Sequence, residues 1–139
     1  MRPPPDEEAR RWLSQAAHVL AVATTLLHQA CYAESCFHAE QVGQLALKAF
    51  LYGRGERFIK LHSVKELVEE CAKHETAFQH LTDAGKTLDQ YYIPTRYPDA
   101  LAFPGLPYET YTERQAKDAV ELATRIYESV RRTVGEKNA

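Results

Sequence analysis

Apolar residues recur at helical spacing along most of the chain, and proline and glycine mark the ends of each run. Residues 7–29 contain neither proline nor glycine, and their apolar positions repeat every three or four residues, which predicts an amphipathic helix. Asp6 precedes this run as a suitable N-cap. A second helix is predicted over residues 33–52, with Gly53-Arg-Gly55 ending it.

Three capping boxes, in which a serine or threonine precedes Glu or Gln by three positions, predict further helix starts at Ser63, Thr76 and Thr112. The helix from Thr76 is expected to end around residues 91–92. Gly43 is the only glycine inside the second helix and indicates a close helix crossing there.

No segment alternates apolar and polar residues for long enough to predict a strand. The pattern therefore predicts an all-α fold, an antiparallel bundle of four to five helices. A chain of 139 residues fits a single domain, with a core over about residues 7–132.

Charge, cysteine content and hydropathy indicate which partners and which cellular location the protein is expected to have. The net charge of -2 excludes an overall basic field for binding a nucleic-acid duplex and leaves a local basic patch as the alternative. Three cysteines without a Cys-x-x-Cys pair are typical of a reducing environment, so a cytoplasmic location is expected. The most apolar stretch, residues 16–30, contains two histidines and is shorter than the ~20 residues of a membrane span, so we expect no membrane association.

No metal or other cofactor is expected. The nearest candidates for metal ligands are His28, Cys31, Cys36 and His38. On a continuous helix Cys31 and His38 share a face but lie ~10 Å apart along the axis, too far for one zinc ion. Small packing residues are the favoured interpretation.

The connection over residues 93–108 holds four prolines and cannot be a continuous helix. Arg96 lies between Pro94 and Pro98, and five of the eight tyrosines lie nearby: Tyr91, Tyr92, Tyr97, Tyr108 and Tyr111. An arginine beside aromatic rings suits a phosphate next to a base. Equally, the tyrosines could cover one end of the bundle while Arg96 pairs with Asp99 or Glu66.

Two further groups of polar side chains could bind a ligand or a partner. His62 immediately precedes a helix start and could join an anion site, although a histidine that fills the turn is the simpler interpretation. Glu40, Gln44 and Lys48 share one helix face, with Gln41 beside them. They could line a cleft or an interface, although such rows are more often solvated.

The predicted helices and the loop around Arg96, in this order along the chain, resemble the HEPN domain (higher eukaryotes and prokaryotes nucleotide-binding). The similarity spans about residues 10 to 132. It is carried by residues 36–51, 61–67 and 88–100 and by the fifth helix, which ends in Ile126-Tyr-Glu-Ser-Val130. The most specific part is Tyr91-Tyr-Ile-Pro-Thr-Arg-Tyr-Pro-Asp99. The resemblance implies a small bundle that usually dimerises and binds nucleotides. It also implies a partner, a separately encoded minimal nucleotidyltransferase in a toxin–antitoxin-like pair.

Some relatives in that family are metal-independent ribonucleases that use an arginine followed, after four to six residues, by a histidine. If Arg96 is that arginine, the histidine should fall at positions 101–103, which are Leu101, Ala102 and Phe103. The other match to the spacing, Arg57-Phe-Ile-Lys-Leu-His62, lies earlier in the chain than the family's motif. Where related sequences carry a glutamate and a lysine in the second helix, this chain has Gln44 and Leu45.

These departures favour a non-catalytic module that binds a nucleotide, RNA or a protein partner. Arg96 would hold phosphate in the loop that includes Asp99, and Tyr92 or Tyr97 would contact the base. His62 and Lys48 would support the anion, and Glu40 or Gln41 would orient the ligand or partner. A ribonuclease using His62 with Arg57 or Arg96, and a purely structural subunit, are the alternatives. A homodimer is expected because the second and fifth helices offer more apolar surface than a small bundle needs.

Overall fold

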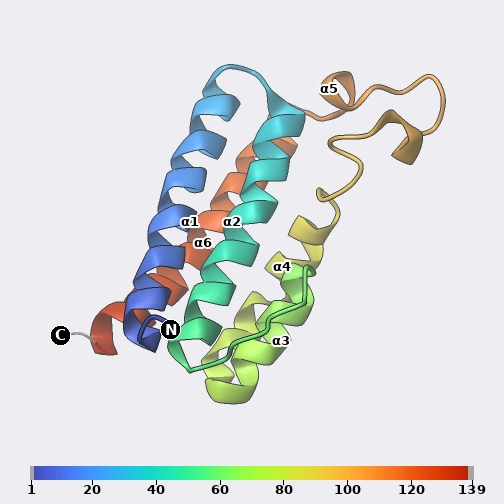
Figure 1. The fold of residues 1–139 in the computed structure, drawn as a ribbon. Coiled ribbons are helices and arrows are strands. Elements are labelled where there is room, and N and C mark those ends of the chain that lie inside the picture. Colours follow the sequence, from blue (N-terminus) through green and yellow to red (C-terminus); the bar gives the residue numbers. More distant parts are fainter. Residues whose placement is uncertain (1, 138–139) are drawn as a thin grey trace.

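Residues 2–137 are described by a computed structural model, in which three long helices lie side by side (Figure 1). They are α1 (Pro5–His28), α2 (Tyr32–Gly53) and α6 (Glu113–Lys137). Two shorter helices, α3 (Val64–His74) and α4 (Thr82–Asp89), pack on α2. The predicted all-α bundle is confirmed, and residues 2–137 contain no strand.

Of the three predicted capping boxes, the one at Thr112 forms completely and the one at Ser63 forms one of its two bonds. The Ser63 hydroxyl accepts a hydrogen bond from the Glu66 amide at 3.1 Å and begins α3. At the start of α6, the Gln115 amide donates to the Thr112 hydroxyl at 3.1 Å, and the Gln115 side chain accepts from the Thr112 amide at 2.9 Å. These bonds satisfy amides that have no partner within the helix.

Two predicted helix starts are wrong in detail. Pro4, not Asp6, is the N-cap of α1, and Asp6 lies in the first turn, where its negative charge favours the helix dipole. Pro5 can open the helix because its missing N–H would have had no partner there. No α-helix begins at Thr76: a 3-10 helix, η1 (Thr76–Leu81), comes first, and α4 is shorter than expected.

The connection between α4 and α6 projects from the side of the bundle and returns to it at the start of α6 (Figure 1). It contains a short 3-10 turn, η2 (Pro98–Ala100), and a single helical turn, α5 (Pro107–Thr110), neither of which the sequence pattern predicted. A proline at the first position starts each turn.

The middle of α2 is the centre of the molecule, because α1, α3, α4 and α6 all pack on this helix. A close crossing occurs at Gly43, as predicted: a Cβ atom there would lie 3.0 Å from a methyl group of Val64 in α3. This crossing brings the start of α3 to the polar side of α2. Among residues 2–137, no helix combines the length and apolar character that crossing a membrane requires.

Candidate functional site

Arg96 lies among three aromatic rings, which we call, together with Arg96, the arginine cluster. Its guanidinium carbon is 4.5 Å from the ring centroid of Phe37, 4.8 Å from that of Tyr92 and 5.0 Å from that of Tyr97. Its Nε–H donates to the Tyr92 carbonyl at 2.9 Å. Stacking on rings and one hydrogen bond orient the guanidinium while the residue stays exposed.

The backbone that carries Arg96 is held by buried contacts. Tyr91 is buried and packs edge-on against Tyr111, with ring centroids 5.9 Å apart. The buried Thr95 hydroxyl donates to the Tyr91 carbonyl at 2.6 Å. The Arg96 amide donates to the Ile93 carbonyl at 3.1 Å. Tyr91 and Tyr111 therefore cover the end of the bundle, while Tyr92 and Tyr97 accompany the arginine.

Arg96 has no ionic partner within the part of the chain that the structure describes: no carboxylate there lies within 4 Å of its guanidinium. The alternative pairings with Asp99 or Glu66 are thus not formed. Asp99 lies exposed in η2, without an ion pair to Arg96. The two Nη groups of Arg96 make no hydrogen bond within residues 2–137, so in this exposed side chain they can bind an anion.

A row of polar side chains runs along α2 from the half-buried Gln41 to the half-buried Lys48. The Glu40 carboxyl accepts hydrogen bonds from Gln41 Nε2 at 2.7 Å and Gln44 Nε2 at 2.6 Å. Lys48 Nζ donates to Gln44 Oε1 at 3.4 Å. Glu40 is 0% exposed, so the row is not the solvated face that polar spacing usually indicates. Its ends are accessible and its centre is buried.

The burial of Glu40 changes its acid–base chemistry. Loss of hydration raises the pKa of its carboxyl to about 7, and the nearby Asp89 adds to that rise. The hydrogen bonds from Gln44 and Gln41, and the positive charge of Arg96, act in the opposite direction. Burial also lowers the pKa of Lys48, against the attraction of Glu40. The Glu40 carboxyl thus changes charge in the neutral pH range. The groups that shift its pKa lie on α2, α4 and the connection.

The arginine cluster and the polar row adjoin on one face of α2. Phe37, which lies under the Arg96 guanidinium, precedes Glu40 by three residues and Gln41 by four, and residues at these spacings share a helix face. Lys48 follows Phe37 by eleven residues, or ~16 Å along the helix axis. Gln41 can therefore reach a ligand held by Arg96, whereas Lys48 lies at the far end of the row.

Asp89, at the end of α4, occupies the N-terminus of α3. Its carboxylate accepts hydrogen bonds from the Val64 amide at 2.6 Å, the Lys65 amide at 3.3 Å and the Ser63 hydroxyl at 2.7 Å. The amides that would bind an anion there already have a carboxylate partner. The adjacent His62 is exposed, so its expected role in an anion site would need a ligand outside this helix end.

The histidine and arginine of the possible ribonuclease pair are both exposed and lie on the segment between α2 and α3. This segment runs along α3 as a nearly straight, non-helical stretch of backbone (Figure 1). Five residue steps of extended chain cover up to ~17 Å. The arrangement separates Arg57 from His62 and gives no support for a shared reacting phosphate. The ribonuclease alternative stays a prediction.

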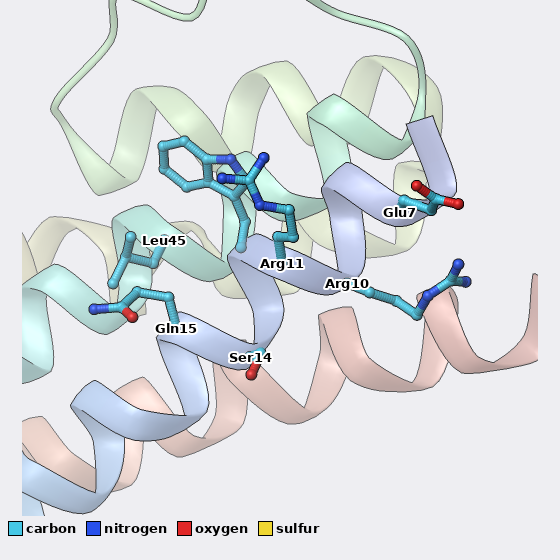
Figure 2. A pocket seen from close by; sticks show the side chains of 7 residues that line it. Glu7, Arg10, Arg11, Ser14, Gln15 and Leu45 are labelled. Atoms are coloured by element: carbon cyan, nitrogen blue, oxygen red, sulfur yellow. The ribbon is translucent and has the colours of Figure 1, made fainter. Parts of the chain in front are cut away.

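A separate hollow of about 740 Å³ lies along the outer side of α1. Figure 2 shows its lining side chains, six from α1 and one from α2: Glu7, Arg10, Arg11, Trp12, Ser14, Gln15 and Leu45. Arg11 pairs with Glu8 at 2.9 Å, and Trp12 packs on Tyr52 with centroids 4.8 Å apart and ring planes tilted by 38°. The hollow contains none of the residues predicted to bind a ligand.

Two of the three cysteines, Cys36 and Cys71, contribute packing rather than reactivity. Cys36 and Cys71 are buried, which raises the pKa of both thiols, that of Cys36 to about 12. Thiolates are therefore scarce at neutral pH. No group of three or more His, Cys, Asp or Glu side chains within residues 2–137 is arranged to hold a metal ion.

Sequence reasoning missed two residues of this region. The apolar pattern assigns Phe37 only to the apolar surface of the second helix, although it supports Arg96, which lies 59 positions later. Asp89 has no distinctive sequence signal beyond a position near a helix end. Both roles depend on contacts between elements that are distant in sequence.

The chain is similar to proteins of one known family in both sequence and fold. Residues 9–133 match the family model of the HEPN domain. The crystal structure of TT1696 from Thermus thermophilus is 38% identical, with a TM-score of 0.84 over 90% of this chain and 97% of that one. ST0689, described as an archaeal HEPN homologue, is 29% identical, with a TM-score of 0.75 over 91% of this chain and 98% of that one.

A human protein shares the same segment. Sacsin from Homo sapiens is 32% identical over 120 residues, which are 82% of this chain but only 3% of sacsin. A domain of this kind thus also occurs as a small part of a much longer protein. With the family match covering most of the sequence and both solved structures sharing its fold, this chain belongs to the HEPN domain family.

Proposed function

We propose that this chain is a non-catalytic nucleotide-binding HEPN module that holds a phosphate group at the arginine cluster. One observation carries the proposal: the exposed Arg96 guanidinium is oriented by three rings and the Tyr92 carbonyl, yet it has no carboxylate partner in residues 2–137. A fixed, unpaired guanidinium can form paired hydrogen bonds with phosphate oxygens.

Some of the residues around Arg96 would contact the ligand directly, and others would act through their neighbours. Both Tyr92 and Tyr97 contact the Arg96 guanidinium, but Tyr97 is the more exposed of the two and can offer its free ring face to a base. Gln41 is the residue of the polar row that can contact the same ligand. Glu40 is buried and would act through Gln41. Lys48 lies too far along α2 to share a phosphate with Arg96, and it supports the row electrostatically.

Replacement of Arg96 by alanine tests this assignment. We expect Arg96→Ala to weaken binding of a mononucleotide such as ATP by roughly 10- to 100-fold, because charged hydrogen bonds contribute about 1.5–3 kcal/mol. The measurement is isothermal titration calorimetry at constant salt, preceded by a thermal-shift screen of nucleotides and short RNA.

A matched control is Arg10→Ala, which removes an exposed arginine from α1 near Trp12, whose ring packs on Tyr52 at the opposite end of α2 from Phe37. It should bind like the unmodified protein. Equal affinities for the unmodified protein and Arg96→Ala would remove the arginine cluster from the site. Equal losses in both variants would show only a general effect of positive charge.

We also propose that the module works with a protein partner, a separately encoded minimal nucleotidyltransferase in a toxin–antitoxin-like pair. Membership of the HEPN family supports this, as do the large apolar side chains that the connection after α4 exposes. Exposed apolar groups that cluster on one segment favour a protein contact. Light scattering of the chain mixed with such a nucleotidyltransferase tests this idea, because a complex has a larger mass than either protein alone.

A further inference from the structure

The most unusual group near the proposed site is a carboxyl that no cation neutralises. Glu40 is fully buried, and its two oxygens contact only the neutral amides of Gln41 and Gln44. No lysine, arginine or histidine nitrogen lies within 4 Å of it in the described part of the chain. A buried acid without a paired charge gains or loses a proton when its electrostatic surroundings change.

Three charged groups act on the Glu40 carboxyl from the elements packed around it. Asp89, at the end of α4, opposes its negative charge, and Arg96, on the connection, favours that charge. Lys48 interacts with it along α2 itself. The ionisation of Glu40 therefore depends on opposing electrostatic effects. Arg96, in the proposed ligand site, favours the ionised carboxylate.

A bound phosphate changes that balance. Its negative charge would offset the positive field of Arg96 at Glu40, and it would add a second unfavourable charge beside that of Asp89. Protonation of the carboxylate by a proton from the buffer would then relieve the repulsion. By reciprocity, protonation of Glu40 would strengthen phosphate binding.

We infer that Glu40 is a positioning residue that couples phosphate binding at Arg96 to the uptake of a proton, so that the site discriminates ligands by their negative charge. This inference rests on the proposed function. Multiply charged phosphate ligands gain from the coupling, whereas a neutral nucleoside does not. Gln41, which donates to Glu40 and lies on the ligand side of α2, transmits the change to the bound molecule.

The expected size follows from linkage. A tenfold gain in the proton affinity of Glu40 on binding corresponds to an uptake of about 0.5 proton per ligand at pH 7.5. The same coupling makes binding about six-fold tighter at pH 6.5 than at pH 8.5. A purely structural role of Glu40 would change affinity without changing the number of protons taken up.

The test is calorimetry of ATP binding to the full chain at pH 7.5 in HEPES and in Tris, whose ionisation enthalpies differ. The difference between the observed enthalpies gives the number of protons taken up. We expect about 0.5 proton for the unmodified protein and less than about 0.1 for Glu40→Gln. Glu34→Gln, which alters an exposed acid on the same helix, should match the unmodified protein.

Carboxyl carbon NMR of Glu40 in the unmodified protein, with and without ATP, keeps the test decisive if Glu40→Gln does not fold. Protonation of Glu40 at a higher pH in the presence of ATP supports the inference. Binding of ATP with equal enthalpies in both buffers and an unchanged Glu40 titration would overturn the inference and leave the proposed function standing. Absence of any ATP binding would overturn both.

Discussion

At the residue scale, Glu40 shows how a single buried group links stability to pH. Its carboxyl is buried in α2, where each of its two oxygens accepts one hydrogen bond from a neutral amide and no cation pairs with its charge. In the ionised state such a group loses hydration that neutral donors only partly replace. The neutral acid is therefore the form that the fold accommodates more easily.

Glu40→Gln should increase stability at alkaline pH. The pKa of this carboxyl rises from 4.5 when unfolded to about 7 when folded. Below pH 4.5 both states are protonated and no penalty exists. The penalty grows as pH rises from 4.5 to 7 and then stays constant, at up to about 3 kcal/mol. Glutamine, being neutral, has no such penalty.

Urea unfolding at about pH 5 and about pH 8, on either side of most of this titration, measures the effect. The stability of Glu40→Gln relative to the unmodified protein should rise between these two values. Glu121→Gln provides the reference, because its carboxyl is exposed on α6 and forms no ion pair within the described residues. A stability difference that does not vary with pH would show that Glu40 is ionised equally in the folded and unfolded states.

At the element scale, α3 and α4 fix one another at the edge of α2. Gly85 in α4 lies directly against the start of α3: a Cβ atom there would be 2.8 Å from Lys65 Cα and 2.9 Å from its amide nitrogen. One turn later, Asp89 caps the same helix start. The glycine permits the approach that brings the Asp89 carboxylate to the amides of α3.

Gly85→Ala should therefore destabilise the protein, although alanine is the better helix former. The added methyl group meets backbone, which cannot move aside as a flexible side chain can, and overpacking of this kind costs about 1–3 kcal/mol. Gly135→Ala is the matched control, because nothing lies within 4 Å of its Cβ position in α6. It should be neutral or slightly stabilising.

Chemical denaturation of the two variants gives the comparison. Opposite effects are expected at the two glycines, with Gly85→Ala unfolding at lower denaturant concentration. Similar stabilities for both variants would mean that α4 shifts away from α3 without loss. In that case the Asp89 cap would also be free to move.

At the scale of the whole molecule, the exposed apolar surface is concentrated on the connection between α4 and α6. Within residues 2–135, five of the six large exposed hydrophobic side chains lie there: Ile93, Tyr97, Phe103, Leu106 and Tyr108. The second predicted helix and the last one instead bury their apolar faces in the core. None of the exposed side chains just named lies on those two helices, although Leu45 and Leu122 there are only partly buried. The connection is therefore the better candidate for a protein contact.

We expect the isolated protein to be a dimer of twice the 15.8 kDa chain mass, held through this connection. Phe103→Ser with Tyr108→Ser should shift it to a monomer, because these side chains are 97% and 64% exposed and have no core role. Multi-angle light scattering measures the mass. Phe58→Ser is the control, since Phe58 is 79% exposed but lies on the segment between α2 and α3.

Monomers of the unmodified protein at high concentration would contradict the dimer. The same instrument then tests the proposed nucleotidyltransferase, as a mixed complex that the double variant fails to form. A protein that stays monomeric alone and in that mixture would remove the connection as an interaction surface.

The sequence by itself determined those parts of the protein that local interactions encode. Helical periodicity and the cap signals at Ser63 and Thr112 each involve residues only three or four positions apart, so they predicted the all-α class and the starts of α3 and α6. The prolines and tyrosines around Arg96 likewise predicted from local composition that this arginine could bind a ligand.

Only the tertiary structure decided what surrounds these residues. It placed Phe37 under Arg96, joined Asp89 to the start of α3 and buried Glu40, although its spacing in sequence suggested a solvated face. These features arise from the approach of segments that are far apart along the chain. The physical reason is that a side chain's hydration, and with it the charge it carries, is set by which distant elements exclude water from it.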